Sequence, residues 1–73
     1  MSNQDVAYSP EELAGFKTVF EAAMASFSPM MLTTFNRLQV AQNVLACAAT
    51  GERDPIELGL AALANVKVVS VQN

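Results

Sequence analysis

The chain contains no histidine, no tryptophan and a single cysteine among its 73 residues. Histidine is the commonest general base and metal ligand in proteins, so its absence removes the usual centre of both kinds of site. The single thiol, Cys47, cannot form a disulfide within the chain, which excludes a small disulfide-stapled secreted scaffold and favours a reducing compartment. No cation lies near Cys47 in the sequence, so we interpret it as a small apolar packing residue. We expect a non-enzymatic protein with no catalytic residue, no cofactor and no metal site.

Charged residues are also scarce, at 15% of the chain against about 25% in an average soluble protein. Four basic and seven acidic residues give a formal net charge of −3, so the chain lacks the basic surface that binding to nucleic-acid phosphates requires. The first residues do not have the basic and apolar regions of a secretory signal. We therefore expect a cytoplasmic protein that does not bind nucleic acid.

Apolar residues, in contrast, make up 52% of the chain, and residues 22–50 carry a single formal charge, Arg37. A domain of this size buries only about 60% of the surface that its unfolded chain exposes. It therefore has more apolar surface than it can hide, and large exposed apolar patches usually mark interaction surfaces. The sequence predicts association with copies of itself or with a larger protein.

Three positions in the sequence place serine or aspartate directly before proline, a pattern that starts helices. In the first, Ser9 can cap the first turn, Pro10 fits the first helical position, and Glu12 can bond back to the cap residue as in a capping box. The pattern predicts a helix over residues 10–27, whose apolar residues recur at steps of three and four. These apolar residues include Leu13, Phe16, Phe20 and Phe27.

The second step, Ser28-Pro29, predicts a sharp corner and a second helix over residues 29–50, because a residue before proline avoids the helical region. Gly51 suits the left-handed position that follows a helix. A single long helix kinked at Pro29 is the alternative. The third step, Asp54-Pro55, predicts a third helix over residues 55–65. Three apolar residues share one face of this helix: Ile56, Leu60 and Leu63.

Residues 66–71 are rich in valine, a composition typical of a strand. A lone strand cannot satisfy its own backbone, so this segment pairs with residues 5–8, pairs with another chain, or continues the third helix. We therefore expect an all-α fold: a single domain over residues 1–73 with a lead-in at residues 1–8, three helices and, as one option, a short C-terminal strand. Because oligomerisation is a common remedy for so small a core, we expect the domain to be oligomeric.

The second helix has a wider apolar arc than packing against one neighbour needs. Its charge, Arg37, has carboxamide neighbours at Asn36, Gln39, Gln42 and Asn43. These polar residues form either an exposed stripe that keeps the helix soluble or a device that fixes register against a partner helix. The predicted interface consists of Leu32, Phe35, Arg37, Leu38, Val44 and Leu45.

The sequence thus favours a small protein–protein interaction module, acting as a regulator, adaptor, inhibitor or structural subunit, that associates with itself, a larger protein or both. A membrane-interacting helical protein is the first alternative, since residues 29–47 approach the length of a membrane span. The polar residues around Arg37 oppose that alternative, because polar groups at the bilayer centre are costly. An accessory subunit of an enzyme complex is the second alternative.

Overall fold

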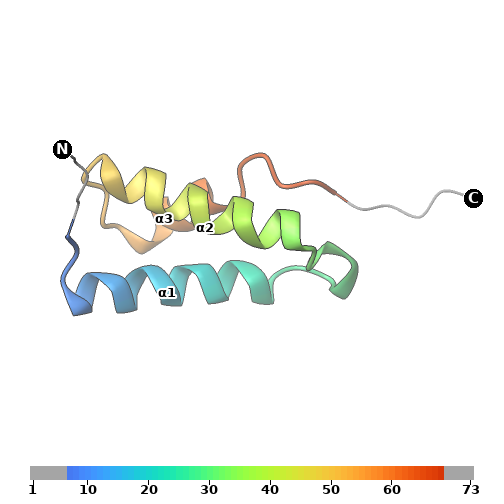
Figure 1. Cartoon of the computed structure of the whole chain (residues 1–73), viewed down its shortest axis with the longest axis horizontal. Coiled ribbons are helices and arrows are strands. Elements are labelled where there is room, and N and C mark those ends of the chain that lie inside the picture. Colours follow the sequence, from blue (N-terminus) through green and yellow to red (C-terminus); the bar gives the residue numbers. More distant parts are fainter. Residues whose placement is uncertain (1–6, 69–73) are drawn as a thin grey trace, which may run out of the picture.

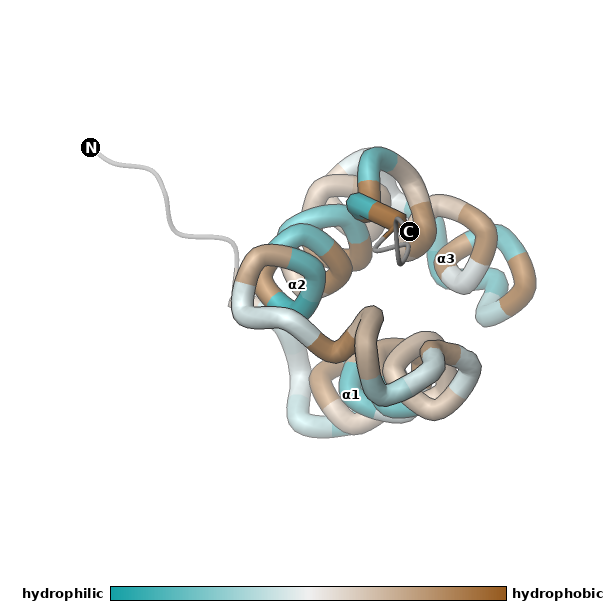
Figure 2. The backbone as a smooth tube through the Cα atoms, turned by 90° about the vertical axis from the view of Figure 1, so that its right-hand side faces the viewer, coloured by the Kyte–Doolittle hydropathy of each residue, from teal (hydrophilic) through white to brown (hydrophobic). Residues whose placement is uncertain are grey.

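A computed structural model describes residues 7–68, in which all regular structure is helical (Figure 1). The helices are α1 (Pro10–Ala25), the short 3-10 helix η1 (Pro29–Met31), α2 (Thr34–Ala49) and α3 (Pro55–Ala62). α2 runs back along α1, and α3 then runs in the direction of α1 (Figure 1). Viewed along their length, α2 and α3 lie on either side with α1 beneath them (Figure 2). The prediction of an all-α domain with three helices is confirmed.

α1 begins with the predicted capping box. The Ser9 hydroxyl accepts a hydrogen bond from the Glu12 backbone N–H at 3.1 Å, and the Glu12 carboxylate accepts one from the Ser9 backbone N–H at 2.9 Å. The helix ends at Ala25, two residues before the predicted end at residue 27. Pro29 holds Ser28 in an extended conformation, with φ −68° and ψ 161°, so the chain leaves the helix before the proline.

The predicted start of the second helix at residue 29 was wrong, because α2 begins at Thr34. Pro29 starts only the single 3-10 turn of η1, as expected of its fixed φ, and Thr33 then caps α2 by accepting from the Asn36 N–H at 3.1 Å. The alternative of one long helix kinked at Pro29 is excluded by the same break. α2 ends at Ala49, and Gly51 takes the expected left-handed conformation with φ 99°.

α3 begins as predicted, with the Asp54 carboxylate accepting from the Ile56 N–H at 2.9 Å, but it ends at Ala62 instead of residue 65. The chain turns there because Asn43 of α2 donates to the carbonyls of Ala62 at 2.9 Å and Ala64 at 2.6 Å. Residues 66–68 are neither strand nor helix, so this part of the segment does not continue the third helix. Pairing with another chain stays a prediction. Residues 69–71 of the predicted strand lie outside the described residues.

The core consists of eight buried apolar residues, and most of them are small. α1 contributes Phe16, Val19 and Ala23, α2 contributes Val40, Val44 and Ala48, and α3 contributes Leu58 and Ala62. The largest fully buried side chains are two valines, Val40 and Val44, and one amide, Asn36. So small a core leaves many of the chain's larger apolar side chains at the surface.

Candidate protein-binding surfaces

The outward side of α2 carries three exposed apolar side chains. Phe35, Leu38 and Leu45 are exposed by 46%, 59% and 47%, and their spacings of three and seven residues put them on one side of the helix. We call these three residues the α2 face. The Lys67 ammonium lies 5.2 Å from the centre of the Phe35 ring, so the basic charge of the C-terminal segment reaches one end of this face.

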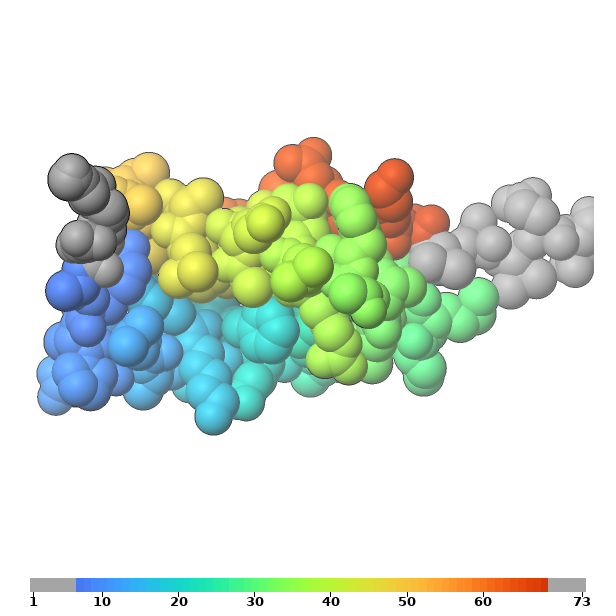
Figure 3. Space-filling model, in the orientation of Figure 1, coloured from blue at the N-terminus to red at the C-terminus, as the bar shows by residue number. Residues whose placement is uncertain are grey.

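The other members of the predicted interface lie in different surroundings. Arg37 is exposed, and Leu32 is half-buried in the short link between η1 and α2. Val44 is only 2% exposed and packs in the core, which corrects its assignment to an interaction surface. A smaller hollow of about 170 Å³, lined in part by Phe20 and Leu45, lies between α1 and α2. Figure 3 shows the face of the molecule on which these two helices meet.

The carboxamides of α2 do not form a continuous exposed stripe. Asn36 is fully buried: its Nδ2 donates to the carbonyls of Met31 and Lys67, each at 2.9 Å, and its Oδ1 accepts from the Lys67 N–H at 2.8 Å. Asn43 holds the end of α3, and Gln39 donates to the Asn43 Oδ1 at 2.9 Å. These two asparagines therefore fix register within the chain: they bind residues 62–67 against α2.

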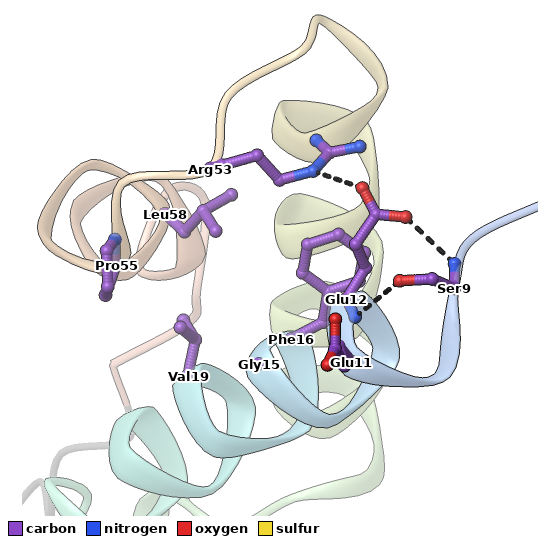
Figure 4. A pocket seen from close by; sticks show the side chains of 9 residues that line it. All are labelled: Ser9, Glu11, Glu12, Gly15, Phe16, Val19, Arg53, Pro55 and Leu58. Carbon is purple, nitrogen blue, oxygen red and sulfur yellow. Dashed lines mark hydrogen bonds and ion pairs between the residues drawn. The ribbon is translucent and has the colours of Figure 1, made fainter.

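A second surface lies between α1 and α3, where two adjoining hollows have volumes of about 350 and 330 Å³. Val19 and Pro55 border both hollows, and the buried side chains of Phe16 and Leu58 line the first (Figure 4). We call the two hollows together the trough. The α1 residues that line it, apart from the core, have small or polar side chains, including Gly15, Thr18, Ala22 and Ser26.

Two helix-interior glycines line this trough, Gly15 in α1 and Gly59 in α3. A glycine inside a helix costs about 1 kcal/mol relative to alanine. A Cβ atom added at either position would meet nothing within 4 Å, and neither residue has the positive φ that demands glycine. Packing within the described chain therefore gives no reason for glycine at either position.

α3 borders the trough with the most exposed apolar row of the three helices. Ile56, Leu60 and Leu63 are exposed by 71%, 66% and 42%, and Leu63 also lines the second hollow. The sequence placed these three residues on one face but did not show that this face points outward. α3 is apolar nearly all round, so its periodicity does not distinguish them from Leu58 and Ala62, which pack in the core.

One end of the trough is closed by a cluster around Arg53. The Arg53 Nε donates to the Glu12 Oε2 at 2.9 Å, and its Nη1 donates to the carbonyls of Ala48 and Glu52, each at 2.7 Å (Figure 4). The guanidinium also lies 5.4 Å from the centre of the Tyr8 ring and 5.3 Å from that of Phe16. The cluster ties the loop before α3 to the start of α1.

The electrostatic consequence of this cluster is a lowered pKa for the Glu12 carboxyl. The backbone N–H of Ser9 stabilises the carboxylate most, and the hydrogen bond from Arg53 adds to it. The sequence identified Glu12 as a capping residue, but nothing in it joined Glu12 to a residue 41 positions away. Both groups hold the chain together: Glu12 caps α1, and Arg53 binds two backbone carbonyls as well as Glu12.

The part of the chain that the structure describes contains no group of three or more His, Cys, Asp or Glu residues able to hold a metal ion. Within the same residues, no helix combines the length and the apolar character that crossing a membrane would take. Cys47 is a half-buried thiol packed against the core. No protein-family model, curated protein or solved structure matches the chain.

Proposed function

We propose that this chain is a non-enzymatic helical interaction module of the cytoplasm, which works by covering its exposed apolar surface with another protein chain. The supporting observation is the number of large apolar side chains at the surface compared with the number of apolar residues in the core. Among residues 7–68, nine large apolar side chains are exposed by 42% to 77%, whereas the core has eight apolar residues. Exposed apolar surface on this scale is characteristic of interaction sites.

The α2 face is the surface that we assign to a larger partner protein. Phe35 and Leu38 stand one turn apart and Leu45 two turns further on, which is the arrangement of a helix that lies in an apolar groove. Burying one such side chain completely contributes about 1.5–3 kcal/mol. The partner groove is therefore apolar, and the Lys67 ammonium beside the Phe35 ring favours acidic residues at that end of its rim.

Affinity capture from the native host, followed by calorimetry on the purified pair, tests this function. We expect Leu38→Glu to weaken the partner at least about tenfold, because a carboxylate would be buried in an apolar groove. Arg37→Glu should weaken it less, because Arg37 lies at the Phe35 end of α2 but not on the side of the helix that carries the α2 face. Leu13→Glu is the matched control: Leu13 is a leucine of similar exposure, 50%, on α1. Circular dichroism establishes that each variant is folded.

Two results would count against the proposal. Equal capture of the same proteins by the wild type, Leu38→Glu and Leu45→Glu would remove the α2 face as a binding surface. Flotation of the purified protein with liposomes, lost in Leu38→Glu, would support the membrane alternative in place of a protein partner.

A further inference from the structure

The α1–α3 side of the molecule presents a ridge and a trough next to each other. The ridge is the row of Ile56, Leu60 and Leu63 on α3, and the trough beside it is lined on α1 by small side chains such as Gly15 and Ala22. A surface of this shape is complementary to itself. A twofold rotation places the ridge of each copy in the trough of the other, which is the geometry of an isologous interface.

The two glycines of the trough are consistent with a second molecule that binds there. Gly15 and Gly59 both line the trough, and no contact among residues 7–68 needs either of them. Glycine allows another backbone or a large side chain to approach a helix closely. The absence of a Cβ at both positions therefore gives room for the ridge of a second copy.

Charge selects the orientation of the two copies. The end of the molecule where α1 and α3 begin carries five acidic residues and one basic residue, Glu11, Glu12, Glu52, Asp54, Glu57 and Arg53. The opposite end carries Arg37 and Lys67. Of the acidic residues among residues 7–68, only Glu21, in the second half of α1, lies closer to this end than to the acidic end. A parallel pair would bring two acidic ends together, whereas an antiparallel pair places each acidic end beside a basic one.

We propose that two copies of this chain pair in antiparallel orientation through the α1–α3 side, with Ile56 and Leu60 of each copy seated in the trough of the other. The pairing deepens the proposed function, on which it rests, by naming one partner and its surface. It leaves the α2 face of both copies free for a larger protein.

Sedimentation velocity on the full chain, from low micromolar to about 100 μM, tests the pairing. We expect the wild type to sediment as a dimer and two variants to associate at least about 100-fold more weakly. Leu60→Glu places a charge on the ridge, and Gly15→Leu fills the trough. Gly15→Leu is informative because its Cβ would meet nothing within 4 Å and the position opens onto a hollow of about 350 Å³, so the helix of the monomer should be at least as stable as before. Leu13→Glu serves as the control and should remain a dimer.

The orientation is tested by a pair of nitroxide labels at Ala25→Cys in a Cys47→Ser background. Ala25 is exposed at the end of α1, so an antiparallel pair separates the two labels by more than about 20 Å along the helix axis. A parallel pair holds them side by side, and that distance would overturn the proposed orientation.

The outcomes separate this inference from the proposed function. A wild type that stays monomeric at 100 μM overturns the pairing, while partner binding through the α2 face is decided independently by capture. A dimer that survives Leu60→Glu and Gly15→Leu but is lost in Leu38→Glu also overturns it, because self-association would then use the α2 face.

Discussion

Residues 55–67, which comprise α3 and the chain after it, contact α2 along one seam and α1 along another, and the two seams are built in opposite ways. Against α2, the seam is closed by amide side chains: the buried Asn36 and the half-buried Asn43 together make five hydrogen bonds to the chain at residues 62–67 and 31. Against α1, the seam is lined by glycine and small side chains and leaves the trough open. Directional bonds with fixed partners define the first seam, and the second has room for a further chain.

The difference separates a seam with fixed hydrogen-bond partners from a seam that is open to solvent. Buried amide groups must be satisfied, so a seam that contains them has one register and cannot admit another molecule. Among the described residues, the α1–α3 seam has one hydrogen-bonded pair of side chains, the exposed ion pair between Glu12 and Arg53 at one end. The open seam can therefore accept a second copy without breaking any bond on the closed one.

The largest effect is expected when the closed seam is broken at Asn36. Asn36→Leu removes the amide and leaves the N–H and carbonyl of Lys67 without their partner, next to a buried side chain. We expect the free energy of unfolding to fall by about 3 kcal/mol, because unsatisfied buried polar groups are costly. Urea denaturation measures it. A loss below about 1 kcal/mol would show that the amide bonds do not close this seam.

Asn43→Ala should have a smaller effect, because Asn43 is only half-buried and its bond to the Ala64 carbonyl is exposed. We expect a loss of about 1–2 kcal/mol in the free energy of unfolding. Gln42→Ala, at the exposed neighbouring position, is the control and should change stability by less than about 0.5 kcal/mol. An equal effect at both positions would contradict a specific role for Asn43.

Much of this architecture was predictable from local signals. The capping box at Ser9, the cap at Asp54 and the left-handed Gly51 act within a few residues, so the sequence specifies them directly. Pro29 shows the limit of such signals. It marks a real break in the chain, but the following helix starts at the next good cap, Thr33, because the Asn36 side chain bonds the carbonyl of Met31 and holds the turn before it.

The surfaces were less predictable, because they depend on contacts between residues far apart in sequence. The carboxamides of α2 have the spacing of an exposed polar stripe, and only the position of residues 62–67 turns two of them inward. Val44 and Leu45 are equally apolar neighbours, yet one packs in the core and the other is 47% exposed. On a helix that is apolar over a wide arc, periodicity cannot say which side faces the rest of the protein.

Replacing the two glycines of the α1–α3 seam with alanine should stabilise the monomer, because this seam has space that the chain itself does not fill. Gly15→Ala and Gly59→Ala each add a methyl group that meets nothing within 4 Å, and each reduces the entropy of the unfolded chain. We expect a gain of about 0.5–1 kcal/mol per substitution in dilute protein, where association does not contribute. The midpoint of urea denaturation reports it. Destabilisation by either substitution would mean that the chain itself packs closely there.

The smallest expected effect concerns the ion pair that ties the open seam at its end. The pKa of the Glu12 carboxyl is lowered in the folded chain from its ordinary value of 4.5, by the Ser9 N–H first and by Arg53 second. A lowered folded pKa means that this carboxylate stabilises the fold above the unfolded pKa and that the contribution is lost as the pH falls through the folded value.

Glu12→Gln keeps an acceptor for the Ser9 N–H but cannot titrate. We therefore expect its denaturation midpoint to fall less between pH 5 and pH 3 than that of the wild type, with Glu11→Gln behaving as the wild type. Identical pH profiles for all three proteins would show that the charge of Glu12, in the cap and the ion pair together, does not contribute measurably to stability.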